Sequence, residues 1–248
     1  MRKEKLLIKD GEYLKTCHDP VSQSMFDHVT QRAEARGMMV NENKTGLMCI
    51  SAAQTFKPGA VLYGKNGNVI ESKEKMRILG FTLDTDGGCG SHVGKTILKI
   101  RRRSWALQKL KRYGFSPEEL VRVYASYIRP IAEYVSAAWH SCLTAEQAAL
   151  LERQQTHALR LIFGYGTSAR KLRQAANIEL LSKRRERACG KFAKKTQANP
   201  RFSSWFKERE FTRARRGSEK NRFHEPTART DRYRNSPLNY LTRRLNNN

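Results

Sequence analysis

The sequence lacks the features that mark several classes of protein. Its five cysteines include no Cys-x-x-Cys pair, and an odd, scattered set argues against both a disulfide framework and a zinc knuckle. No apolar run approaches the roughly 18 residues of a membrane-spanning helix. The N-terminus, MRKEKLLIKDGE, has no apolar signal-peptide segment. We therefore expect an intracellular protein, nuclear or cytoplasmic, that is not secreted and has no membrane partner.

Acidic residues are also scarce. The 248 residues include 23 Asp and Glu against 48 Lys and Arg, which gives a net charge of +25. Solubility alone needs a charge of only roughly 2–8. The excess is uneven, with 13 basic and 11 acidic residues in residues 1–90 but 35 and 12 in the remainder. Because nucleic acid is the commonest polyanion, we expect RNA, DNA or an RNA–DNA hybrid to bind the second part.

The motifs that resemble enzyme sites are incomplete. Gly94-Lys95-Thr96 would need a glycine at position 89 to form a P-loop, and that residue is Cys89. Residues 164–169 fit G-x-G-x-x-A but follow a helical pattern rather than a strand. Residues 84–86 open like a calcium loop, yet the twelfth position is a lysine. The residues alone thus predict no active site, no metal site and no small-molecule cofactor.

The first part of the chain predicts a small α/β arrangement. A helix is expected from Pro20 to Gly37, with Val21, Met25 and Val29 on one face. Strands are expected over 47–51, over 60–63 with 68–70 across a Gly-rich turn, and over 77–83, followed by a loop over 84–90. The first 19 residues give no clear periodic signal.

The second part predicts helices throughout. An apolar stripe runs from Val93 to Leu110 and ends at Gly114. A capping box at Ser116 begins a further helix, which Pro130 should interrupt. A second capping box at Thr144 begins another helix, which ends at Gly164. Residues 172–199 are helical with a break near position 177. Beyond residue 200 the chain is Arg-rich and poor in aliphatic residues, so we expect an extended or disordered tail.

Basic residues gather on the polar sides of two of these helices. The alternative is a solvated helix face, but such faces normally mix charges of both signs, whereas Glu186 is the only acid between Lys183 and Lys195. Phosphate contact is therefore the favoured interpretation. The candidate nucleic-acid-binding residues are Arg101, Arg102, Arg103, Lys109, Lys111, Arg112, Arg184, Arg185, Lys191, Lys194 and Lys195. Four aromatic residues could stack on bases or could equally pack in the core: Tyr113, Trp139, Tyr165 and Trp205.

Six segments in order resemble the reverse transcriptases of non-LTR (LINE-type) retrotransposons. RGMMVNENKT (36–45) is similar to motif D of the palm, and ILGFTLD (78–84) to motif E, the primer grip. VYASYIRP (123–130) with the Glu133–Trp139 segment resembles the thumb, which LERQQ (151–155) and RLIFG (160–164) continue. The remaining matches are RRE (184–186) with KFA (191–193), and ARTDRYRNSP (228–237). The resemblance covers roughly residues 20–246.

The resemblance implies roles for individual residues. Lys44 would be the motif D lysine that can protonate departing pyrophosphate. Leu79, Gly80 and Phe81 would form the primer grip, and the thumb would follow an RNA–DNA hybrid across its minor groove. The intact family enzyme holds two Mg²⁺ ions with an upstream Asp and a [FY]-x-D-D hairpin. This sequence has no Asp-Asp pair, and Asp10 alone, in the segment before Pro20, could not hold both ions.

The sequence thus predicts an α+β protein in four parts: an N-terminal segment (1–19) that is poorly ordered, the C-terminal part of an antiparallel palm (20–88), a helical thumb and post-thumb domain (89–199), and a basic, partly disordered tail (200–248). The expected function is that of a fragment of an RNA-directed DNA polymerase that binds template–primer nucleic acid without polymerising by itself. Two alternatives stay open. One is a full reverse transcriptase whose N-terminus is wrongly bounded, and the other is a host-adopted, non-enzymatic RNA- or DNA-binding module.

Overall fold

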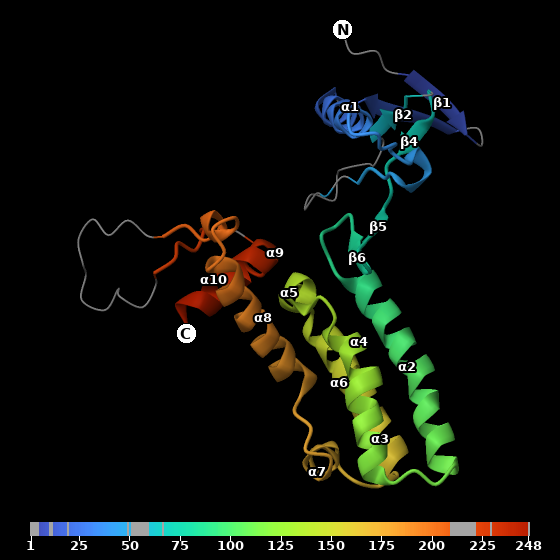
Figure 1. Ribbon diagram of the computed structural model, residues 1–248, viewed down its shortest axis with the longest axis vertical. Coiled ribbons are helices and arrows are strands. Elements are labelled where there is room, and N and C mark those ends of the chain that lie inside the picture. The colour runs from blue at the N-terminus through green and yellow to red at the C-terminus, as the bar shows by residue number, and fades with distance from the viewer. Residues whose placement is uncertain are drawn as a thin grey trace. The chain divides into compact units, whose positions relative to one another are not determined.

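Figure 1 shows the computed structural model of the chain. It describes residues 5–9, 12–18, 20–48, 50, 60–65, 67–208, 222–228 and 230–247, with only the backbone described for 5–9, 12–18 and 60. The chain divides into two compact units, Met1–Ser91 and His92–Asn248. The first holds all the strands of the described residues and the second is helical, so the expected α+β class is confirmed.

The first unit is built on a four-stranded sheet of order β1-β2-β3-β4. Its strands are β1 (Lys5–Lys9), β2 (Glu12–His18), β3 (Ala60–Tyr63) and β4 (Val69–Glu71). The β1–β2 and β3–β4 pairs are antiparallel, as expected for the second pair, whereas β2 and β3 run parallel. β1 and β2 lie in the first 19 residues, which were expected to be poorly ordered and for which the sequence predicted no element. Residue 10 lies outside the described residues.

Helix α1 (Pro20–Glu34) matches the predicted helix and is followed by Gly37 at φ +72°. It meets β3 through a polar side chain: the Gln23 amide accepts a hydrogen bond from the Tyr63 N–H (2.8 Å) and donates one to the Tyr63 carbonyl (2.9 Å). The apolar face of α1, which includes Met25, is exposed. The predicted strand over 47–51 is reduced to a bridge between Leu47 and Ser72 among the described residues.

One predicted strand is wrong: residues 77–83 form a hairpin instead. Its strands are β5 (Lys75–Ile78) and β6 (Phe81–Asp84), paired antiparallel. Between them, Leu79 and Gly80 have φ angles of +48° and +87°. Two successive positive φ values define the type I′ turn, whose twist matches that of the flanking strands. Gly80 adopts this conformation readily, and Leu79 adopts it under strain.

In the described part of the second unit, nine α-helical or shorter helical segments precede residue 200. In chain order they are α2 (Gly90–Arg112), α3 (Pro117–Val123), η2 (Tyr124–Ile128), α4 (Arg129–Glu133), α5 (Ser136–Trp139), η3 (His140–Cys142), α6 (Ala145–Phe163), α7 (Ala169–Ala175) and α8 (Leu181–Gln197), with η4 (Ser203–Trp205) just beyond that residue. The predicted capping boxes at Ser116 and Thr144 are both formed. The break near position 177 is also confirmed, because Asn177 has a φ of +51°.

Pro130 disturbs its helix as predicted. A proline in a helix cannot donate a hydrogen bond to the preceding turn, and its ring crowds that turn. Here the chain passes from α3 into a π-helical segment, η2, and then into α4, which has Pro130 in its first turn. The wider π-helical turn brings Tyr124 and Ile128 into the core, where both are buried.

The prediction of an extended or disordered tail is wrong for residues 231–234 and 237–246. Helices α9 (Asp231–Arg234) and α10 (Pro237–Asn246) form there, and α10 packs against α8. Their shared core is Cys189, Ala193, Phe206, Phe223 and Leu241. The Asn246 side chain also bonds both the N–H (2.9 Å) and the carbonyl (3.1 Å) of Phe223. The basic tail is therefore largely part of the helical unit.

Candidate nucleic-acid interface

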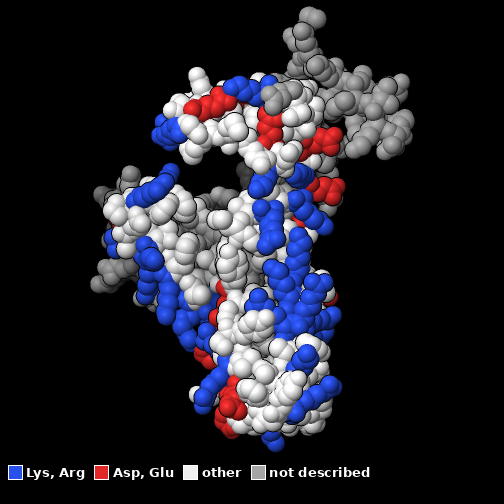
Figure 2. Space-filling view, turned by 45° about the vertical axis from the view of Figure 1, so that its right-hand side comes forward, with Lys and Arg blue, Asp and Glu red and all other residues white. Residues whose placement is uncertain are grey.

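Helix α2 carries the most uniform charge in the described part of the chain. Its buried side is an apolar stripe that includes Val93, Ile97, Ile100 and Leu107. Over 23 residues it has eight Lys and Arg and no Asp or Glu. Figure 2 shows the Lys and Arg side chains gathered along this helix. Four of its exposed cations form no hydrogen bond or ion pair with a backbone carbonyl or a carboxylate of the described residues. We call these four the α2 basic face: Lys99, Arg102, Lys109 and Arg112.

Three predicted binding residues of α2 are held by contacts within the helical unit. Arg101 donates to the Gln154 side chain of α6 at 3.3 Å. Arg103 donates to the Tyr127 carbonyl at 3.0 Å, and its guanidinium lies 4.4 Å from the centre of the Tyr127 ring. Lys111 donates to the carbonyls of Leu161 (3.0 Å) and Ile162 (2.8 Å), so it satisfies the C-terminal end of α6. These three side chains therefore hold α2 against the rest of the helical unit, and a ligand would have to compete with those contacts.

Helix α8 presents a second line of cations, which lies to the left of the α2 cations in Figure 2. We call four exposed lysines of this helix the α8 basic face: Lys183, Lys191, Lys194 and Lys195. Within the described ranges, none of them forms an ion pair with a carboxylate. The acid on this helix, Glu186, is paired with Arg244 of α10 at 2.9 Å. The charge of the α8 basic face is thus not neutralised by α8 itself.

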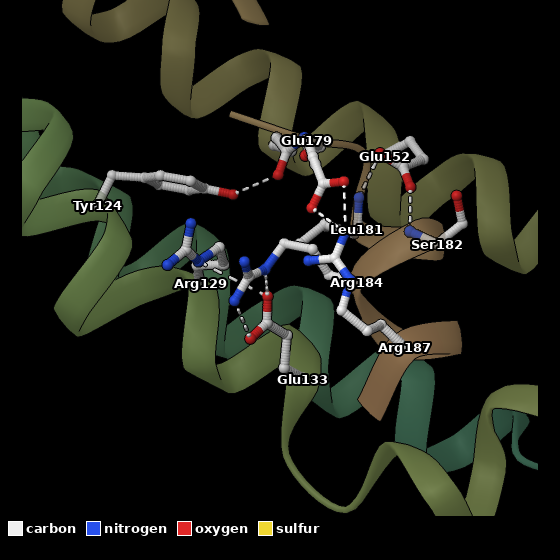
Figure 3. Close-up of polar contacts among 10 residues, drawn as sticks. Tyr124, Arg129, Glu133, Glu152, Glu179, Leu181, Ser182, Arg184 and Arg187 are labelled. Carbon is white, nitrogen blue, oxygen red and sulfur yellow. Dashed lines mark hydrogen bonds and ion pairs between the residues drawn. The ribbon is translucent and has the colours of Figure 1, made fainter. Parts of the chain in front are cut away.

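Arg184, a predicted binding residue, lies instead in a polar cluster that joins α4, α6 and α8 (Figure 3). Its guanidinium donates to both carboxylate oxygens of Glu133, and the pKa of Arg184 is raised by that bond. Arg129 lies 3.6 Å from the same carboxylate. With its side chain partly buried, Arg184 serves to connect helices.

Glu152 of α6 completes this cluster by capping a helix to which it does not belong. Leu180, the N-cap residue of α8, makes no side-chain cap. The Glu152 carboxylate accepts hydrogen bonds from the N–H groups of Leu181 (3.3 Å) and Ser182 (2.8 Å) instead, as Figure 3 shows. A carboxylate at a helix N-terminus satisfies free N–H groups and meets the positive end of the helix dipole.

The placement of Arg185 needs a correction. The sequence groups it with exposed cations, but its side chain has no exposed surface. It lies on the buried stripe of α8 at four-residue spacing from Leu181 and Cys189. Burial lowers the pKa of Arg185. A guanidinium inside the core cannot reach a phosphate, so Arg185 is removed from the candidate interface.

The aromatic candidates also divide by exposure. Trp139 is fully buried and contacts His92, with ring centres 5.4 Å apart. Tyr113 and Tyr165 are exposed and stay candidates for stacking. Trp205 is 54% exposed, but its ring packs on that of Phe202, with centres 5.0 Å apart, and lines an apolar pocket, so the packing alternative applies to it. Trp105 was not among the predicted residues. It is 56% exposed on α2, among the cations of the α2 basic face. Its three-residue spacing from Arg102 and four-residue spacing to Lys109 was the available signal.

The residues singled out by resemblance lie in the first unit. Lys44 is exposed at the end of the short helix η1 (Glu42–Lys44), which Asn41 caps. Leu79, Gly80 and Phe81 form the β5–β6 turn, and Leu79 is 87% exposed. Within the described ranges, no three His, Cys, Asp or Glu side chains converge as they would to hold a metal ion. Gly94-Lys95-Thr96 lies inside α2, where the apolar stripe that begins at Val93 predicts a helix.

Comparison with known proteins adds no assignment: no protein family, no curated protein and no solved structure matches the chain significantly. Among the helices that the structure describes, none combines the length and apolar character needed to cross a membrane.

Proposed function

We propose that this chain binds template–primer nucleic acid, as RNA, DNA or an RNA–DNA hybrid, through the exposed basic faces of α2 and α8, and that it does not polymerise by itself. The observation that carries the proposal is the α2 basic face. Its cations project from a helix without a single acidic residue and have no carboxylate partner in the described parts of the chain. The natural counterpart of such a face is a row of phosphates.

The ion pairs of acidic residues elsewhere in the helical unit support this proposal. Glu133, Glu179 and Glu186 each pair with an arginine, at Arg184, Arg187 and Arg244 respectively. Three acidic residues near α8 are therefore already neutralised by arginines, while no carboxylate of the described residues pairs with the lysines of the α8 basic face. Exposed cations that remain unpaired gain more from a polyanion, because each phosphate they neutralise releases condensed counterions.

The resemblance to LINE-type reverse transcriptases is the reason to propose template–primer nucleic acid as the ligand. The α2 helix follows the segment that is similar to motif E, and the α3–α6 region is the part that resembles the thumb. On this view, the exposed turn at Leu79 and Gly80 would contact the primer backbone. The absence of an Asp-Asp pair from the sequence is the reason to propose binding without polymerisation.

Fluorescence anisotropy of a labelled RNA–DNA hybrid at several salt concentrations tests the binding. If about six phosphates are neutralised, log affinity falls with log salt concentration at a slope near −5. A slope close to zero would show that phosphate contacts do not dominate and would contradict the proposal.

Primer extension by the full chain with magnesium and nucleotides tests the second half of the proposal. We expect no extension, because two metal ions cannot be held without paired carboxylates. Extension that persists when Asp10 is replaced by Asn would show that another set of carboxylates holds the metal ions.

A further inference from the structure

Trp105 is a large apolar side chain exposed on a helix face that is otherwise cationic. It is 56% exposed, although its helix has a complete buried stripe on the opposite side. Arg102 precedes it by three residues and Lys109 follows by four, so all three side chains project from one face of α2. The indole therefore contributes little to the core of the helical unit and is accessible to a ligand.

The ring is also held in place. The Lys109 ammonium lies 4.2 Å from the centre of the Trp105 ring, within the range of a cation–π contact. This contact occupies one face of the indole and limits its rotation. The opposite face is left as the surface on which a planar group could stack.

We propose that Trp105 stacks on an unpaired base of a nucleic acid whose phosphates lie along the α2 basic face, so that this face prefers single strands or loops to fully paired duplex. This inference rests on the proposed function and narrows its ligand. In a duplex both faces of each base are covered by its neighbours, whereas an unpaired base offers a free π-face. A stacked base contributes about 1–3 kcal/mol, which corresponds to roughly 5- to 150-fold in affinity.

A protein partner is the competing explanation for an exposed apolar side chain here. Leu98, one heptad before Trp105 on the same face, is 53% exposed and could extend an apolar contact. However, Lys99, Arg102 and Lys109 surround these two residues with positive charge. Desolvating three cations against an apolar protein surface is costly, while phosphates on either side of a stacked base would neutralise them.

The test compares Trp105→Ala with Trp205→Ala in the full chain. Trp205 is a matched control because it is 54% exposed but lies in an apolar pocket of about 770 Å³ with Phe192 and Leu238, away from α2. The probes are a labelled oligothymidine of about 16 nucleotides and a duplex of equal length. Both tryptophans are exposed, and circular dichroism checks that each variant keeps its helical content.

We expect Trp105→Ala to weaken binding of the single strand by at least about fivefold and to leave binding of the duplex nearly unchanged. Trp105→Phe should keep most of the affinity, and Trp205→Ala should change neither. Indole emission gives an independent reading, because in a Trp205→Phe background the remaining tryptophans are Trp105 and the buried Trp139. The single strand should quench this emission and the duplex should not.

The outcomes separate the two proposals. Salt-dependent binding that Trp105→Ala leaves intact for both probes, or weakens equally for both, overturns the stacking proposal and leaves the proposed function standing. Failure of the unsubstituted chain to bind either probe at low salt contradicts both proposals, and Trp105 and Leu98 would then belong to a protein contact.

Discussion

The guanidinium carbon of Arg185 lies 5.5 Å from the centre of the Trp139 ring, and neither side chain has exposed surface. The Arg185 Nε makes one long hydrogen bond, 3.5 Å, to Nδ1 of His140. Its two terminal nitrogens have no hydrogen-bond partner among the described residues. Desolvating a cation without a bonded carboxylate is unfavourable. Arg185 therefore contributes its volume and aliphatic stem to the core rather than its charge.

Replacing Arg185 by methionine should keep or increase stability. Methionine fills a similar length without a buried charge, so the free energy of unfolding should stay equal or rise by about 1 kcal/mol. Arg185→Ala leaves a cavity beside Trp139 and should lower that free energy by about 2 kcal/mol or more. Urea unfolding measures both. The methionine variant should also bind hybrid as the unsubstituted chain does, and a loss of binding would return Arg185 to the interface.

Glu152 should stabilise α8 although it lies on α6. Glu152→Ala removes the acceptor for the N–H groups of Leu181 and Ser182, and we expect a loss of about 1–2 kcal/mol in the free energy of unfolding. Glu152→Gln, which keeps one acceptor oxygen, should lose less. Glu146→Gln, at an exposed carboxylate of α6, is the control. Equal effects of Glu152→Ala and the control would argue against the cap.

His140 should make stability sensitive to acid. Burial, together with Arg185 and Arg244, lowers the pKa of His140 from 6.5 to about 4, against the opposing charge of Glu186. Between these values the unfolded chain binds a proton that the folded chain excludes, so stability falls as the pH falls from 6.5 towards 4. The ring also packs edge-on against Tyr240 of α10, with centres 5.6 Å apart.

The measurement is the urea midpoint as a function of pH across that window. His140→Gln should show a shallower decline than the unsubstituted chain, because it removes one of the groups that titrate on unfolding. A His140→Gln profile parallel to that of the unsubstituted chain would refute a buried, neutral His140.

Local chemistry made much of the helical unit predictable. Ser116 and Thr144 have an acceptor three residues later, and both capping boxes form because the pattern is satisfied within one turn. The hairpin at Leu79 and Gly80 was missed, since a leucine at positive φ is rare and no typical turn dipeptide such as Asn-Gly stands there. Helix α10 was missed because the Arg-rich composition of the tail outweighed the apolar residues Tyr240, Leu241 and Leu245. Ser236-Pro237 was an available helix start signal.

The candidate interface was predictable as a charge distribution but not residue by residue. Composition located the cations on α2 and α8. It could not show that Lys111 would bond to the end of α6 or that Arg184 would pair with Glu133, since both contacts join segments about fifty residues apart. Arg185 carried a usable signal in its four-residue spacing from Leu181 and Cys189. The general preference of arginine for the surface outweighed it.

The salt dependence of binding by charge variants tests the central claim most directly. Lys99→Gln, Arg102→Gln and Arg112→Gln together remove three charges from the α2 basic face and leave Lys109 on Trp105. The slope of log affinity against log salt should move towards zero by about 2 to 3. Arg153→Gln, Arg170→Gln and Lys171→Gln, at exposed positions of α6 and α7, remove the same charge and should leave the slope unchanged. Equal shifts in the two triple variants would mean that overall charge, and not the α2 basic face, attracts nucleic acid.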